Sequence, residues 1–199
     1  MRRTNSLLVS MSVVLTLAAC SPKPAAPPPS AAAETSASPA GGLQAVDSVV
    51  GLMAGQIAPS SAFLWEAVGT VTTKKGTEEK QPRTDAEWAA VRRQALILIE
   101  ASNLLMVPNR HVAWTGEHRA NPPGATDLTP EQADAAIAKN WPAFMAFAVN
   151  LRSSALETLK TIDAKDANAL MESGGAIDEA CEACHKVFWY PDPPAGAAK

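Results

Sequence analysis

Residues 129–163 read TPEQADAAIAKNWPAFMAFAVNLRSSALETLKTID, and this stretch decides the fold class. Apolar residues return along it every three or four positions, which is the period of an amphipathic helix. Thr129 and Pro130 supply a cap and a first-turn proline at its start, and Pro142 predicts a kink or break inside it. The residues of the apolar face are Ala133, Ile137, Trp141, Phe144, Ala148, Leu151, Ala155, Leu159 and Ile162.

An earlier helix is expected to begin near Asp47 or Ser48. Pro59 is expected to interrupt it, because a proline ring removes one helical hydrogen bond and crowds the preceding turn. Ser60 can cap a continuation, after which residues 72–83 are expected to form a polar loop. The apolar residues of both parts are Val46, Val49, Val50, Met53, Ile57, Leu64, Ala67, Val68 and Val71.

Two more helices complete the pattern. The capping box Thr84-Asp85-Ala86-Glu87 opens one of them, and Pro108 ends it and begins a long loop that reaches residue 128. Its inner face would be Trp88, Val91, Ala95, Leu98, Leu105 and Met106. Asp166 can cap the last helix, in which Gly174-Gly175 is a weak point. Its inner face would be Leu170, Ile177, Cys181, Cys184 and Phe188.

The composition agrees with a helical fold. Of 199 residues 47% are hydrophobic and only 5% are aromatic, with no alternating strand pattern, which disfavours a β-sandwich. Four amphipathic segments predict an all-α protein, an antiparallel four-helix bundle. The net charge of −3 argues against an electrostatic nucleic-acid binder, and three cysteines are too few for a disulfide-rich scaffold.

The N-terminus has the layout of a secretory signal. Arg2 and Arg3 precede an apolar stretch over residues 7–19 that is too short for a lasting transmembrane helix. The stretch ends in Leu17-Ala18-Ala19-Cys20, which resembles the lipobox of bacterial lipoproteins. The resemblance implies that residues 1–19 are removed and that Cys20 becomes the lipidated N-terminus. An ordinary signal peptide with an incidental Cys20 is the alternative.

Residues 20–42 are predicted to be the lipidated cysteine and a tether. The stretch is almost wholly Pro, Ala, Ser and Gly, so it cannot bury enough apolar surface to offset the loss of chain entropy. Its prolines favour an extended chain. We therefore expect a folded domain over residues 43–199, lipid-anchored on the periplasmic side of a bacterial membrane.

The sequence Cys181-Glu182-Ala183-Cys184-His185 is CxxCH, the signature of c-type haem attachment. On a helix the two cysteines are three residues apart, so both thiols meet one edge of a flat macrocycle and can form thioethers with its vinyl groups. His185 follows directly and can bind the iron as the proximal ligand. The motif predicts one covalent haem c per chain.

Three other kinds of site also contain paired cysteines. A redox dithiol usually accompanies a βαβ pattern, which is missing from this sequence. A zinc site needs further ligands, and the chain has no second CxxC and no HxxxH. A plain disulfide leaves His185 without a role.

A CxxCH motif on the last helix of a predicted four-helix bundle resembles class II cytochromes c, the cytochrome c-prime family. The resemblance covers about residues 43–190 and is specific at Cys181, Cys184 and His185. The loop 108–128, the interrupted first helix and the ending Trp189-Tyr190-Pro191 look less typical of that family.

The resemblance also bears on the sixth iron position. In this family the first helix covers the distal haem face; low-spin members place a methionine there, and high-spin members leave the iron open to small gases. Met53 is the implied sixth ligand, because it lies on the inner stripe of the first helix beside the small residues Ala54 and Gly55. Core filling is the alternative for Met53, and Met106 is the second candidate.

Other side chains have supporting roles in this hypothesis. His111 and His118 lie in or beside the long loop and are expected to be solvated, since ligation by a second histidine requires that loop to fold over the haem edge. Arg92, Arg93 or Lys186 can pair with the haem propionates. The tryptophans expected in the core are Trp65, Trp88 and Trp141.

Together these features predict a membrane-tethered periplasmic cytochrome with one haem c that transfers electrons to and from unidentified redox partner proteins. The chain shows no nucleophile–base pair, so we do not expect an enzyme, and we expect no nucleic-acid partner. The alternatives are a cytochrome that binds nitric oxide at an open sixth position, and a structural lipoprotein with a disulfide. A homodimer is one oligomeric state that the sequence permits.

Overall fold

The structure is a computed structural model, and it describes residues 42–117, 124 and 126–191. The predicted signal peptide, Cys20 and nearly all of the tether lie outside these residues, as does His118. Nothing below concerns their structure.

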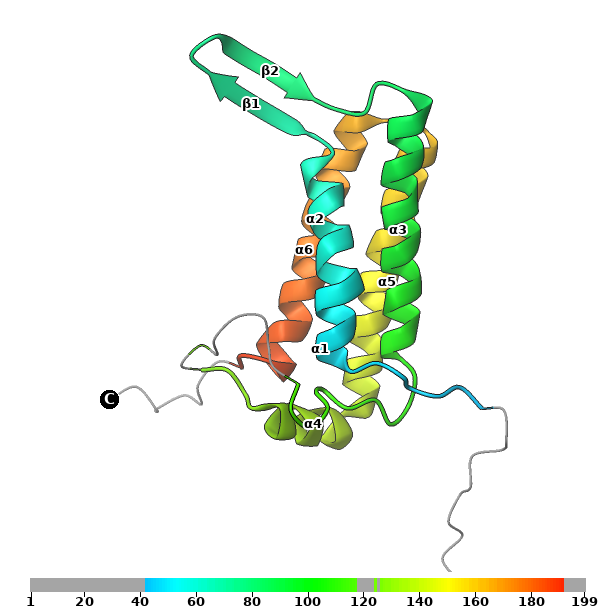
Figure 1. The fold of residues 1–199 in the computed structure, drawn as a ribbon, viewed down its shortest axis with the longest axis vertical. Coiled ribbons are helices and arrows are strands. Elements are labelled where there is room, and N and C mark those ends of the chain that lie inside the picture. Colours follow the sequence, from blue (N-terminus) through cyan, green and yellow to red (C-terminus); the bar gives the residue numbers. More distant parts are fainter. Residues whose placement is uncertain (1–41, 118–123, 125, 192–199) are drawn as a thin grey trace, which may run out of the picture. The chain divides into compact units, whose positions relative to one another are not determined.

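Helices dominate the described part of the chain (Figure 1). The first helical run comprises α1 (Val49–Leu52), the π-helix η1 (Met53–Ile57) and α2 (Ala58–Glu66). A hairpin of β1 (Gly69–Thr73) and β2 (Gly76–Lys80) follows, and then α3 (Asp85–Leu105), α4 (Pro130–Lys139), α5 (Trp141–Asp163) and α6 (Ala167–Phe188).

The long helices pack on one another around a shared apolar core. α3 lies against α2 and α5, α6 lies against α5 and α2, and the short α4 contacts both α5 and α6. Side chains from every one of these helices enter the core. Its most buried large members are Leu52, Leu64, Leu98, Ile162, Leu170 and Ile177.

The hairpin corrects the prediction of an all-α fold with a polar loop over residues 72–83. β1 and β2 pair antiparallel from Gly69 opposite Lys80 to Thr73 opposite Gly76. Gly76 has φ 127, a conformation that glycine adopts at little cost. The strands are rich in threonine and include Val71, which is 48% exposed and not part of a helix. Because nearly every strand residue faces water, hydrophobic periodicity carries no signal for this element.

The first helix corrects a second expectation, because it continues through Pro59. Immediately before the proline the helix widens into the π-turn η1, in which the backbone N–H of Ala58 donates to the carbonyl of Met53. This register change accommodates a residue that has no N–H and whose ring crowds the previous turn. Ser60 is therefore not a cap; it is buried, and its hydroxyl donates to Gln94 Oε1 at 3.0 Å.

The helix starts are largely as predicted. Ser48 caps α1 by accepting a hydrogen bond from Gly51 N at 2.8 Å, so Val46 precedes the helix and is 83% exposed instead of facing inward. Thr84 forms the expected capping box with Glu87. Thr129 forms a similar box with a glutamine three residues on, and Pro130 is the first residue of α4.

The break in the long amphipathic segment and the start of the last helix also lie close to their predicted positions. The long amphipathic segment divides into α4 and α5 at Asn140, two residues before Pro142. Asp166 caps α6 by accepting from Ala169 N at 3.0 Å. The helix continues through Gly174 and Gly175 without interruption.

Candidate functional site

The CxxCH motif occupies the last two turns of α6. Cys181, Cys184 and His185 are all half-buried, and both cysteine side chains pack against the edge of the apolar core. Neither cysteine is in a disulfide. The thiols therefore lie one helical turn apart, as predicted, and they face the protein more than the solvent.

Cys181 and His185 lie on the same stripe of α6 as Gly174, which contacts α2. Gly174, Asp178, Cys181 and His185 follow one another at intervals of three or four residues, so they share one stripe of the helix. Trp65 of α2 contacts this stripe, because its Nε1 donates to the carbonyl of Gly174 at 3.0 Å. Cys181 and His185 therefore continue, toward the end of α6, the stripe that contacts α2 at Gly174.

A cavity of about 300 Å³ lies on the same line of contact. Its walls include Leu64 and Trp65 of α2 and Val68, which follows α2, and they extend along α6 as far as Asp178. The cavity thus ends about one helical turn before Cys181. It adjoins the motif and does not include it.

Burial sets the chemistry of the two thiols. Burial raises the pKa of Cys181 to about 11, and the nearby carboxylates of Asp178 and Glu182 add to the effect. Burial also raises the pKa of Cys184 to about 12, with a further contribution from Cys181. Both residues are protonated thiols at neutral pH. A catalytic redox dithiol needs a lowered thiol pKa instead.

Burial acts on His185 in the opposite sense, because it disfavours the charged form. It lowers the pKa of the imidazole, and the carboxylate of Glu182 opposes this shift. The neutral imidazole has a free electron pair on one ring nitrogen, which is the form that binds iron. The donor set therefore fits a c-type haem: two thiols for attachment and one neutral imidazole for the metal.

Met53 lies at the same end of the helices as the motif. The first helical run and α6 are antiparallel (Figure 1). Met53 precedes Trp65 by about three turns, and His185 follows Gly174 by about three turns. Met53 is half-buried and packs against the core. Met106, just after α3, is also half-buried against the core. Ligation by either sulfur stays a prediction.

The other candidate residues are more dispersed. The exposed side chain of His111 places Nδ1 3.2 Å from Asp134 Oδ2 of α4. Arg92 pairs with Asp163 at 2.7 Å, close to the start of α6 and far along that helix from the motif. Lys186 lies beside the motif.

The three tryptophans that were expected in the core differ in how deeply they are buried. Trp88 is buried as predicted, at 8% exposure, and Trp141 is half-buried and stacks on Phe144. Trp65 was expected in the core but is 40% exposed. Its indole N–H needs an acceptor, which it finds in the Gly174 carbonyl at the helix surface.

Two aromatic residues beside the motif had no predicted role. The ring centroid of Trp189 lies 4.8 Å from that of His185 with the planes at 88°, and the Tyr190 ring lies 5.8 Å away. Tyr190 donates its hydroxyl to Glu182 Oε1 at 2.5 Å. Burial and this bond raise the pKa of Tyr190 to about 12. The only sequence signal was an aromatic pair directly after the motif helix.

No three His, Cys, Asp or Glu side chains of the described ranges converge as a site for a bare metal ion. Haem iron does not require such a cluster, because the macrocycle supplies four nitrogen ligands and the protein one or two. Comparison of the chain with protein-family models, curated proteins and solved structures gives no match. Each helix of the described ranges is too short or too polar to span a bilayer.

Proposed function

We propose that this protein is a periplasmic mono-haem c-type cytochrome of the cytochrome c-prime type, tethered to a membrane through Cys20, that transfers electrons. The observation that carries the proposal is the arrangement of Cys181, Cys184 and His185 at the end of α6. Two thiols outside any disulfide, one turn apart, precede a neutral imidazole, and all three side chains are half-buried near the end of α6.

The proposed architecture is an antiparallel four-helix bundle in which α6 is the haem-attachment helix. Its members are the first helical run, α3, α5 and α6. The pairwise packing of α2 on α3, α3 on α5, α5 on α6 and α6 on α2 supports this arrangement. The hairpin and α4 are additions to it.

The thiol chemistry supports attachment over a redox role. In each thioether the sulfur of Cys181 or Cys184 bonds to one carbon of a vinyl group, and the thiol hydrogen goes to the other carbon. Both residues are in the protonated form at neutral pH. When bound, the haem supplies an iron that exchanges one electron between its ferric and ferrous forms.

The axial ligands then determine which function dominates. We propose His185 as the proximal ligand and Met53 as the sixth. A thioether sulfur is a soft, neutral ligand that favours ferrous iron, so it raises the reduction potential and suits electron transfer. The half-buried position of Met53, at the same end of the helices as His185, supports this assignment.

Nitric oxide binding at an open sixth position is the second candidate. The cavity of about 300 Å³ between α2 and α6 is the observation that favours it, because it leaves space for a small apolar ligand about one helical turn from Cys181. In this alternative Met53 fills the core.

One set of spectra tests both candidates. The pyridine haemochrome assay on the purified full chain should show one haem c, and its absence would leave a thiol or disulfide lipoprotein. The ferric spectrum should then contain a methionine–iron charge-transfer band and be unaffected by nitric oxide. A high-spin ferric spectrum that changes when nitric oxide is added would favour the second candidate.

A further inference from the structure

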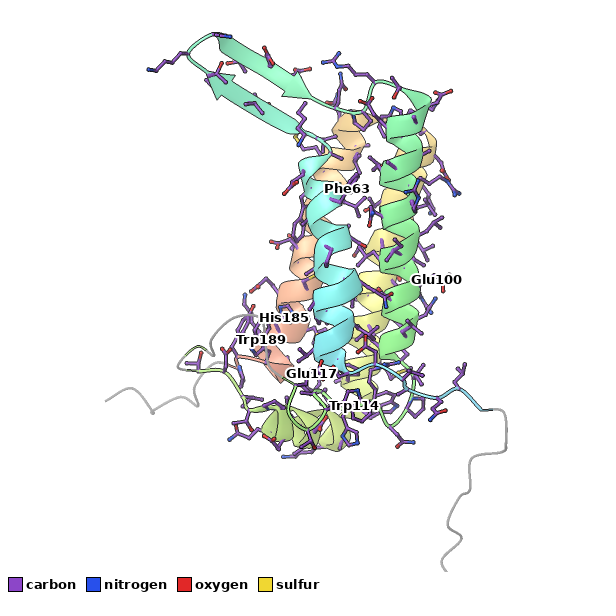
Figure 2. All side chains as sticks on the ribbon, viewed as in Figure 1. Phe63, Glu100, Trp114, Glu117, His185 and Trp189 are labelled. Carbon is purple, nitrogen blue, oxygen red and sulfur yellow. The ribbon has the colours of Figure 1, made fainter. Side chains whose placement is uncertain are left out.

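The chain folds back on itself directly after α6. The backbone N–H groups of Trp189 and Tyr190 both donate to the carbonyl of His185, at 2.8 and 2.9 Å. Both aromatic rings are thereby brought against the imidazole, with the Trp189 ring almost perpendicular to it. Figure 2 shows His185 and Trp189 together at the end of α6.

Each of these two residues also has a hydrogen-bond partner other than the carbonyl of His185. Trp189 Nε1 donates to Asp127 Oδ2 at 2.8 Å, and its carbonyl accepts from Leu128 N at 2.7 Å. The Tyr190 hydroxyl donates to the carboxylate of Glu182, inside the motif itself. Hydrogen bonds to carboxylates are among the stronger ones in proteins. The two rings are therefore fixed by contacts that do not involve the His185 side chain.

We infer that Trp189 and Tyr190 are positioning residues for His185, holding its imidazole in one orientation toward the iron and covering it from solvent. This inference rests on the proposed function. Metal-ligating histidines usually owe their orientation to a hydrogen bond on the second ring nitrogen. In this protein two anchored aromatic rings restrict rotation of the imidazole by packing. The aromatic ending is one of the three parts of the chain that look less typical of cytochromes c-prime.

The test uses the purified haem-loaded full chain and three substitutions. Trp189→Leu removes the perpendicular ring, Trp189→Phe keeps an aromatic ring without the indole N–H, and Tyr190→Phe removes only the hydroxyl that bonds Glu182. The matched control is Trp114→Leu. Trp114 is 40% exposed against 36% for Trp189, and it makes a comparable edge contact of 5.2 Å with His111, which is not part of the motif.

The readouts are the ferric electron paramagnetic resonance spectrum and the midpoint potential. Trp189→Leu should split or broaden the ferric signal, because the imidazole then takes several orientations, and it should shift the midpoint potential. Trp189→Phe should largely restore both readouts. Tyr190→Phe should broaden the signal less than Trp189→Leu does, and Trp114→Leu should leave both readouts as in the wild type.

Each other outcome overturns the inference in a recognisable way. If Trp189→Leu and Tyr190→Phe both bind haem and both give the wild-type ferric signal, the positioning role is rejected. The cytochrome proposal then stands. If Trp114→Leu changes the ferric signal and the midpoint potential as much as Trp189→Leu does, the change is a general effect of losing a tryptophan. The positioning role is then rejected. No haem in the wild-type chain rejects the function and the positioning role together. If Trp189→Leu does not fold, Tyr190→Phe by itself decides the question.

Discussion

The indole nitrogen of Trp65 lies 3.0 Å from the carbonyl oxygen of Gly174, and this hydrogen bond joins α2 to α6 at the edge of the cavity. Glycine favours this close approach, because a Cβ on Gly174 would lie 3.0 Å from Cδ1 of Trp65, closer than ordinary van der Waals contact. A Cβ on the neighbouring Gly175 would meet nothing within 4 Å. The hydrogen bond therefore marks one level at which α2 and α6 contact each other.

Alanine substitutions at the two glycines measure this contact. Gly175→Ala should raise the free energy of unfolding by about 1 kcal/mol, since alanine is the better helix former. Gly174→Ala gains the same helix propensity, but its new Cβ must displace the Trp65 ring. We therefore expect a smaller increase in the free energy of unfolding than for Gly175→Ala, or a decrease. Urea unfolding of both variants provides the comparison. Equal stabilisation at the two positions would show that the Trp65 contact has no energetic weight.

The second prediction concerns haem attachment. Cys181→Ala and Cys184→Ala should each weaken covalent retention of haem, and the double variant should abolish it, because no thioether remains. Alanine is compatible with a helix, so α6 should still form. The measurement is haem staining after denaturing electrophoresis, with circular dichroism as the control for folding. Haem that stays covalently bound in the double variant would contradict the assignment.

The third prediction concerns the sixth ligand. Met53→Leu nearly conserves side-chain volume and should cost less than about 1.5 kcal/mol of packing. The fold should persist while the ferric iron changes from low-spin to high-spin, which the optical spectrum reports. Met106→Leu is the matched control and should leave the spin state unchanged. A wild-type spectrum that is already high-spin, or one that Met53→Leu does not alter, would assign Met53 to the core.

The fourth prediction concerns acid stability and the cap of α3. Hydrogen bonds from the backbone N–H groups of Arg83 and Thr84 lower the pKa of Glu87, and the Thr84 hydroxyl adds to them. Because the folded pKa lies below the unfolded one, ionised Glu87 contributes stability above the unfolded value of about 4.3. That contribution is lost as the pH falls through the folded pKa.

Glu87→Gln should therefore flatten the fall in the free energy of unfolding between about pH 5 and pH 3. Glu78→Gln, on the exposed hairpin, removes the same charge without touching a cap and serves as the control. Thr84→Ala should cost about 1 kcal/mol at neutral pH through the lost cap. Urea titrations at several pH values measure both effects. Parallel curves for Glu87→Gln and the wild type would remove Glu87 from the acid response.

The fifth prediction concerns the anchor. Cys20→Ser should yield a protein that carries no acyl chains and is either soluble or left with its leader attached. Two or more acyl chains anchor a protein stably where one does not. Detergent phase separation and intact-protein mass measure the change. Wild-type protein that partitions into the aqueous phase would reject the lipoprotein hypothesis.

Local interactions explain why much of the helical structure was predictable. A cap such as Thr84 with Glu87 or Asp166 with Ala169 is satisfied within one turn, so its residues are visible together in the sequence. The same holds for the three-residue spacing of Cys181 and Cys184. Haem attachment, iron ligation by Met53 and lipidation of Cys20 remain predictions from these patterns.

The sequence by itself determined where most helices begin, which faces are apolar, and which three residues form the candidate site, because each of these depends on neighbours along the chain. Only the tertiary structure decided that the helix passes Pro59, that Trp65 lies at the surface, and that Trp189 packs on His185. Trp189 is held by Asp127, 62 residues away, and Trp65 by Gly174, 109 residues away. No local pattern encodes such a contact, because it forms only when folding brings the two segments together.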